Sequence, residues 1–130
     1  NRTVLQSHIG EWGTVPEDAD YRRVLRGSNV VLSTALHEFQ GLAVQEAVAS
    51  GCLPRVPDRL AYPEFFPDAC RYASYPEDAW REAGVLAERL ALLAKRHRRG
   101  ELPAPPSSTH MCWPALANRY ADILEATAGQ

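Results

Sequence analysis

A continuous apolar run leads into a helical pattern between residues 29 and 51. Residues 30–32 (Val-Val-Leu) lie between polar neighbours, and a short β-branched run of this kind is typical of a strand buried on both faces. In residues 41–50 apolar side chains recur at the helical period, and a second strand is expected at 53–56, although Pro54 counts against it. Strands that alternate with helices indicate parallel βαβ units, so the sequence predicts an α/β fold with a parallel sheet flanked by helices.

The remaining elements follow from caps, prolines and periodicity. We expect a weak strand at 4–12, a helix at 17–26, a short helical turn at 62–66, a strand at 71–73, a long helix at 76–98 and a final amphipathic helix at 113–124. Ser74 and Glu77 have the spacing of a capping box at the start of the long helix. One apolar stripe is expected along that helix, made of Trp80, Ala83, Ala87, Leu90, Leu93 and Ala94.

Length and composition restrict the class of protein. The chain has 130 residues and a net charge of −2, which excludes a surface that is basic throughout and built for nucleic acid. The sequence has no apolar run of 18 residues and no leader pattern. Its three cysteines are widely spaced, which indicates reduced thiols and does not fit a zinc motif. We therefore expect a cytoplasmic protein without a membrane span or a metal site. We divide it into a nucleotide-binding domain at 1–102, followed by a linker and amphipathic helix at 103–130.

The chemistry-bearing residues cluster directly after the first buried strand. Glu38 and Glu46 are eight positions apart, at most about 12 Å along a helix, and Gly41 lies between them where a helix begins. Ligands bind at the carboxyl edge of open parallel sheets, and a helix amino end offers unpaired amides to a phosphate. The spacing suits two carboxylates that hold opposite ends of an extended ligand: sugar hydroxyls on Glu38, a diphosphate on the amides of Gly41 and Leu42, and ribose hydroxyls on Glu46. The alternative is that both glutamates are ordinary surface residues.

These residues also carry a resemblance to a known family. His37-Glu38-x-x-Gly41 with Glu46, followed by the stretch Ala47 to Pro54, resembles the E-x7-E motif of retaining family-4-type glycosyltransferases of the GT-B fold. The final helix at 113–124 is similar to the last helix of such enzymes, which crosses back to their N-terminal domain. The resemblance implies a Rossmann-like nucleotide-sugar-binding half of a two-domain enzyme, with the N-terminal acceptor domain missing.

A narrower resemblance is to the tRNA-queuosine mannosyltransferase subfamily. It rests on the stretch Ser33 to Phe39 (STALHEF) and on a loop from Tyr62 to Pro67 (YPEFFP). This resemblance implies GDP-mannose as donor, queuosine in tRNA as acceptor, and no further cofactor. The implied catalytic residues are Glu38 and His37. The implied donor-binding residues are Phe39, Gln40, Gly41, Leu42 and Glu46, and Tyr62, Pro63 and Glu64 could line the base or acceptor side, unless they form a packing turn. His37 could equally be structural.

The sequence departs from the family pattern before residue 29. The basic residues that neutralise the donor diphosphate in the family have no recognisable counterpart there. We therefore expect the chain alone to be inactive in sugar transfer, and an uncovered sheet edge to favour self-association. Two alternatives stay open: a non-catalytic nucleotide-binding or interaction module, and a related transferase that acts on a glycan or lipid acceptor. A dehydrogenase half is disfavoured because no Gly-x-Gly-x-x-Gly follows a strand.

Overall fold

A parallel β-sheet forms the centre of the molecule in a computed structural model that describes residues 5–129. Within these residues the sheet has three strands in the order β1 (Val30–Leu32), β2 (Leu53–Pro57) and β3 (Arg71–Tyr72). Both strand pairs are parallel, with Val30 opposite Leu53 and Val56 opposite Arg71. The sheet and its flanking helices confirm the predicted α/β, Rossmann-like class.

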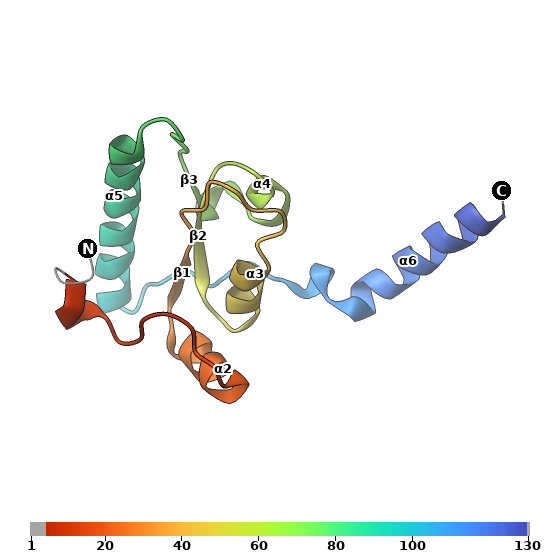
Figure 1. The fold of residues 1–130 in the computed structure, drawn as a ribbon, viewed down its shortest axis with the longest axis horizontal. Helices are drawn as coiled ribbons and strands as arrows, with labels where there is room; N and C mark the ends of the chain where they lie inside the picture. The colour runs from red at the N-terminus through yellow and green to blue at the C-terminus, as the bar shows by residue number, and fades with distance from the viewer. Residues whose placement is uncertain (1–4, 130) are drawn as a thin grey trace.

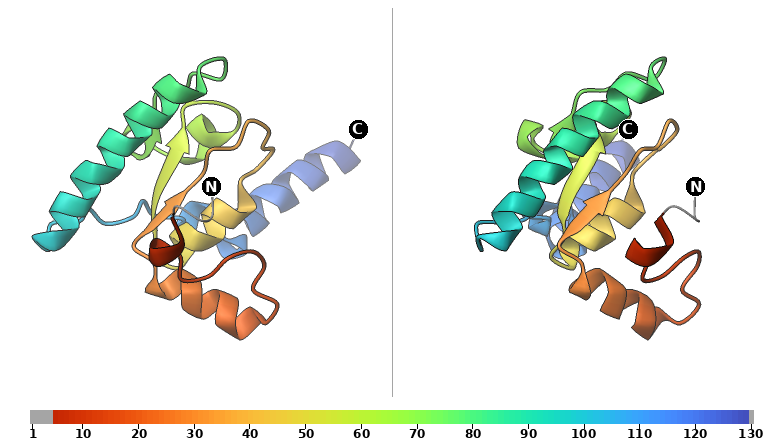
Figure 2. Two further views of the ribbon diagram at one scale, coloured as in Figure 1. Left: turned by 60° about the vertical axis from the view of Figure 1, so that its left-hand side comes forward. Right: turned by 90° about the vertical axis from the view of Figure 1, so that its left-hand side faces the viewer.

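Helices cover both faces of this sheet. The helix α3 (Leu42–Ala49) packs on one face and the long helix α5 (Ala79–Arg98) on the other, as Figures 1 and 2 show from three directions. The core is therefore built from both sides of the sheet, with Val44 and Val48 of α3 and Leu93 of α5 buried around the strands.

The other elements are short or peripheral. They are η1 (Gln6–His8), α2 (Asp18–Gly27), α4 (Tyr62–Phe65), η2 (Asp68–Cys70), η3 (Thr109–Met111) and α6 (Trp113–Ala128). Most bounds lie within two residues of the predicted ones. The helix α5 begins three residues later than predicted, and α6 ends four residues later. The expected strand at 4–12 is wrong, because a 3-10 turn and irregular chain occupy residues 5–12, while residue 4 lies outside the described part.

The strand β2 tolerates two prolines because of where they stand in the ladder. Arg55 accepts a hydrogen bond from Ser33 N–H, and Leu53 N–H donates to Asn29, so the odd-numbered residues of β2 bond toward β1. Pro54 therefore faces β3, which begins only opposite Val56. Pro57 faces β1 beyond the last paired position, Leu32 opposite Arg55. Neither missing N–H costs a ladder hydrogen bond, so the doubt raised by Pro54 was misplaced.

The start of α5 differs from the prediction. The helix begins at Ala79, and the carboxylate of Asp78 caps it by accepting a hydrogen bond from Arg81 N–H at 3.0 Å. The expected capping box of Ser74 and Glu77 is wrong, because Asp78 is the residue that stands next to the first helical turn. The buried face is also rotated: Glu82, Leu86 and Leu93 are buried, whereas Trp80 is 91 % exposed.

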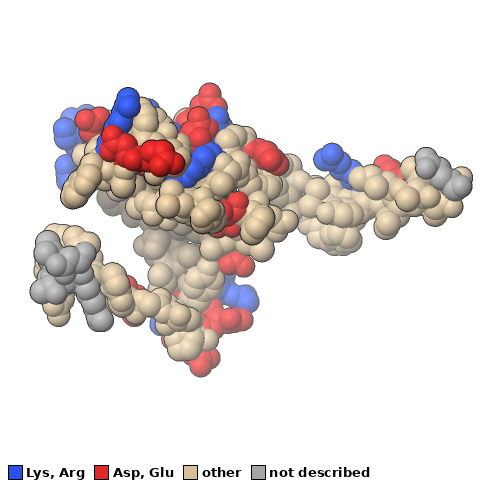
Figure 3. Space-filling model, turned by 45° about the horizontal axis from the view of Figure 1, so that its top comes forward, with Lys and Arg blue, Asp and Glu red and all other residues tan. Residues whose placement is uncertain are grey.

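The C-terminal helix α6 projects away from the rest of the molecule. No residue of α6 is buried, and Figure 1 shows the helix extending outward alone. In the space-filling view its surface is mostly uncharged (Figure 3). Its exposed apolar side chains are Trp113, Tyr120, Ile123 and Leu124.

Candidate functional site

The turn between β1 and α3 carries the first of the two predicted glutamates. Glu38 is half-buried, and its carboxylate accepts a hydrogen bond from Phe39 N–H at 3.0 Å. Its Cγ would lie 3.8 Å from a Cβ placed on Gly41. Glu38 is therefore folded back against the amino end of α3, where the sequence predicts the sugar-binding carboxylate.

Gly41 fixes the geometry of that helix end. It is buried and has φ of +64°, a left-handed conformation, as the residue that immediately precedes α3. A Cβ at this position would lie 2.9 Å from Cε1 of Tyr62, so the close approach also requires glycine. The first main-chain donor inside the helix is Gln45 N–H, which bonds to the Gly41 carbonyl at 2.9 Å. The amides of residues 42–44 precede that donor, and such amides give a helix end its affinity for anions.

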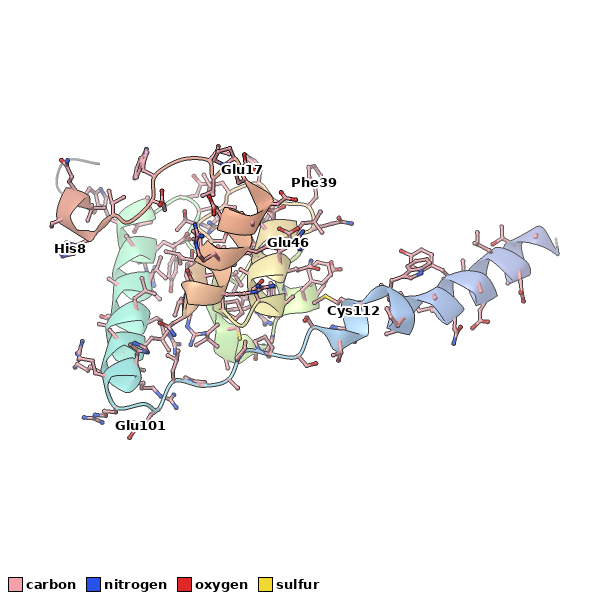
Figure 4. All side chains as sticks on the ribbon, turned by 90° about the horizontal axis from the view of Figure 1, so that it is seen from below. His8, Glu17, Phe39, Glu46, Glu101 and Cys112 are labelled. Carbon is pink, nitrogen blue, oxygen red and sulfur yellow. The ribbon has the colours of Figure 1, made fainter. Side chains whose placement is uncertain are left out.

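Glu46 lies on α3, facing α2. Its side chain is exposed and accepts a hydrogen bond from the hydroxyl of Tyr21 at 3.1 Å. Burial raises the pKa of Tyr21, and the bond to Glu46 raises it further. Figure 4 shows Glu46 beside α2, with Phe39 on the preceding loop. Glu46 lines a pocket of about 360 Å³ with Tyr21 and Arg26, which Glu38 does not line, so the two carboxylates flank the helix end without sharing this pocket.

The other candidates divide into exposed and buried residues. His37, Gln40 and Leu42 are exposed, and Phe39 is 94 % exposed at the tip of the turn. Pro63 and Glu64 are exposed as well. Tyr62 is fully buried, and this burial favours the packing role that we left open for it over contact with a ligand.

Hydroxyl groups of α4 and β3 form hydrogen bonds to the start of the turn. The Ser33 and Tyr62 hydroxyls are hydrogen-bonded at 2.7 Å, and Ser33 Oγ accepts from Ala35 N–H at 3.2 Å. The Tyr72 hydroxyl donates to the Ser33 carbonyl at 2.8 Å, and burial raises the pKa of Tyr72 to about 12. The chain leaving β1 is thus tied at Ser33 to α4 and to β3.

An ion pair that sequence reasoning missed fastens the same segment to α5. Arg59 donates to the Ala35 carbonyl at 2.9 Å and to the Thr34 carbonyl at 3.3 Å, and its Nη1 is 2.6 Å from the Glu82 carboxylate. Glu82 also accepts from Tyr75 N–H at 2.6 Å. The bond from Arg59, opposed by burial and aided by the Tyr75 amide, lowers the pKa of Glu82. No local signal in the sequence indicated this pair, because the predicted stripe along the helix did not include Glu82.

A pocket opens at this carboxyl edge of the sheet. It has a volume of about 300 Å³ and lies between the turn and the first half of α5. Thr34 and Leu36 line one side, and Tyr75, Glu82 and Leu86 line the other. The edge that parallel sheets use for ligands is therefore hollowed on the side of α5, but none of the predicted site residues lines this pocket.

Residues 5–129 contain neither a candidate metal site nor a helix that could span a membrane. No group of three or more His, Cys, Asp or Glu side chains in this range is arranged to hold a metal ion. The helices of the same range are all too short or too polar to cross a membrane.

The comparisons with known proteins include a partial match to a curated enzyme. A stretch of 51 residues is 45 % identical to the tRNA-queuosine alpha-mannosyltransferase of Drosophila melanogaster. This stretch makes up 39 % of the chain and 14 % of that relative, so the match supports a relationship to a glycosyltransferase over a short segment. No protein-family model matches the chain, and no solved structure matches it.

Proposed function

We propose that this chain is the nucleotide-sugar-binding part of a glycosyltransferase that transfers mannose from GDP-mannose to queuosine in tRNA. The observation that carries the proposal is the 45 % identity to a tRNA-queuosine alpha-mannosyltransferase. The geometry supports it independently: a left-handed glycine, a glutamate on each side of it, and a helix amino end lie at the carboxyl edge of a parallel sheet. In this proposal residues 1–102 bind the donor, and residues 103–130 form a linker and a helix that docks on an acceptor domain.

The proposed donor lies across the amino end of α3. Its diphosphate accepts hydrogen bonds from the amides of Gly41 and Leu42, where the helix dipole favours negative charge. The mannose hydroxyls contact Glu38, with His37 beside it, and the ribose hydroxyls contact Glu46. Glu46 already accepts a hydrogen bond from the Tyr21 hydroxyl, which orients its carboxylate for a second partner. Phe39 and Gln40 cover the sugar, and the exposed Pro63 and Glu64 face the base or acceptor side.

The proposed reaction retains the configuration of the anomeric carbon. The bond from that carbon to the diphosphate oxygen breaks, and the acceptor hydroxyl forms a bond on the same face. The hydroxyl proton passes to the departing diphosphate, so no protein nucleophile is needed. Glu38 stabilises the positive charge that develops on the sugar, and the α3 amides stabilise the negative charge on the leaving group. Catalysis then depends on positioning by the turn and the amino end of α3.

Kinetics of the full-length protein test these roles. With GDP-mannose and a queuosine-containing tRNA, we expect Glu38→Gln to lower kcat about 10²-fold or more, because it removes a charge that acts in the transition state. We expect Glu46→Gln mainly to raise the KM for the donor, about tenfold or more, because it weakens one charged hydrogen bond.

Glu88→Gln is the matched control, because Glu88 is an exposed glutamate on α5, away from the turn. Its kinetics should equal those of the wild type. Full activity in both Glu38→Gln and Glu46→Gln would refute the assignment, and nucleotide binding without any transfer would favour a non-catalytic module.

A further inference from the structure

A second pocket lies at the opposite edge of the sheet. It has a volume of about 360 Å³ and is formed where β2 and β3 begin, by the second half of α5 and by the proline-rich segment after it. Its lining includes three arginines, Arg55, Arg89 and Arg96, together with Cys70. No aspartate or glutamate of residues 5–129 is part of that lining. The proposed donor site does not account for this concentration of positive charge.

Arg55 is the unusual member of the three. It points from the central strand and is only 8 % exposed, yet it forms no ion pair with a carboxylate of the described residues. Its Nη1 donates to the carbonyls of Pro54 at 2.9 Å and Ala69 at 3.0 Å. The Cys70 side chain is a further hydrogen-bond partner of Arg55. None of these partners is a carboxylate, and a guanidinium has five N–H donors and keeps its charge, so Arg55 retains an unbalanced charge and donor capacity for an anion.

The surroundings of Arg55 add positive charge. Burial lowers the pKa of Arg55, the Cys70 thiol opposes this effect, and Arg89 and Arg96 lower the pKa further. A buried charge is ordinarily compensated by an opposite charge, because an uncompensated one is strongly destabilising. Here two exposed arginines on one face of α5 raise the positive potential at the mouth of the pocket. Arginine is also the residue best suited to bind phosphate through paired donors.

We propose that the pocket lined by Arg55, Arg89 and Arg96 is a binding site for a small phosphate-class anion, such as a free phosphate, a pyrophosphate or the terminal phosphate of a phosphomonoester. Arg55 holds the anion at the base of the pocket, and Arg89 and Arg96 close over it from α5. The site stands at the amino edge of the sheet and does not depend on the proposed function at the carboxyl edge.

Inorganic pyrophosphate is the probe for a calorimetric titration of the full chain at low salt. We expect binding that weakens as salt rises, and we expect Arg89→Gln to reduce the affinity about tenfold, because it removes one charge-assisted contact. Arg98→Gln is the matched control, since Arg98 is an exposed arginine at the end of the same helix but does not line the pocket.

Thermal unfolding provides a second test, because the effect of Arg89→Gln on the melting temperature should differ between buffer without and with pyrophosphate. In buffer without multivalent anions we expect Arg89→Gln to melt at a higher temperature than the wild type, because it relieves repulsion toward Arg55. With pyrophosphate added, the wild type should gain more stability than the variant. Titration with phosphate, pyrophosphate and glucose 6-phosphate separates free anions from phosphomonoesters. No binding by the wild type, or equal losses in Arg89→Gln and Arg98→Gln, would overturn the proposal.

Discussion

The substitution Gly41→Ala tests the packing of the turn that forms the candidate site. Gly41 has φ of +64°, and an L-residue in this conformation costs about 1–2 kcal/mol. The added Cβ would also lie 2.9 Å from Cε1 of Tyr62. That ring is fully buried and its hydroxyl is held by Ser33, so it has little room to move, and overpacking of this kind costs about 1–3 kcal/mol. We therefore expect Gly41→Ala to lower the free energy of unfolding by about 2–5 kcal/mol.

Urea denaturation followed by circular dichroism measures this loss, and Gly84→Ala provides the control. Gly84 is inside α5 with no atom within 4 Å of its added Cβ, so alanine there should stabilise the protein by up to about 1 kcal/mol. Adding Gly41→Ala to a Tyr62→Leu variant separates the two costs. Relative to Tyr62→Leu alone, the double variant should lose only the backbone cost of about 1–2 kcal/mol. If Gly41→Ala proved as harmless as Gly84→Ala, the argument from the turn would be wrong.

Three further predictions concern titration and reactivity. Folding lowers the pKa of Glu82, so the stability that its ion pair with Arg59 contributes is present above the unfolded pKa of about 4.3 and is lost as the pH falls. Denaturation measured between about pH 3 and 7 should therefore show a smaller decrease in the free energy of unfolding for Glu82→Gln than for the wild type. The pKa of Tyr72 is raised to about 12, so stability should decrease as pH rises from about 10 toward that value, and alkaline denaturation of Tyr72→Phe should lack this component. A thiol reagent should modify the exposed Cys112 rapidly in the native protein and the two buried cysteines only after unfolding, and rapid loss of all three thiols would contradict the burial.

The sequence predicted the central fold because its signals there are local. The apolar run at 30–32, the helical period of α3 and the glycine before it determine one βαβ unit, and the structure has that unit. Pro54 wrongly counted against the strand β2, because the effect of a proline depends on which neighbouring strand its missing N–H would face. That information lies in the registration of β2 with β3, which is not local.

The supporting parts of the site were not predictable in the same way. Arg59 and Glu82 are 23 positions apart in sequence, and their ion pair exists only because α5 packs over the edge of the sheet. The apolar stripe predicted along α5 was right at Leu93 but wrong at Trp80, which is exposed, whereas Glu82 and Leu86 are buried. Which residues hold the turn was therefore decided by tertiary packing, while the residues on the turn itself were visible in the sequence. The roles of those turn residues stay predictions.

Calorimetric titration of GDP and of UDP into the full-length protein decides whether the amino end of α3 binds a nucleotide sugar. We predict that GDP binds in preference to UDP, that Glu46→Gln weakens GDP binding about tenfold or more, and that Glu88→Gln leaves it unchanged. Absence of GDP binding by the wild type, or binding that is insensitive to Glu46→Gln, would contradict the proposed function.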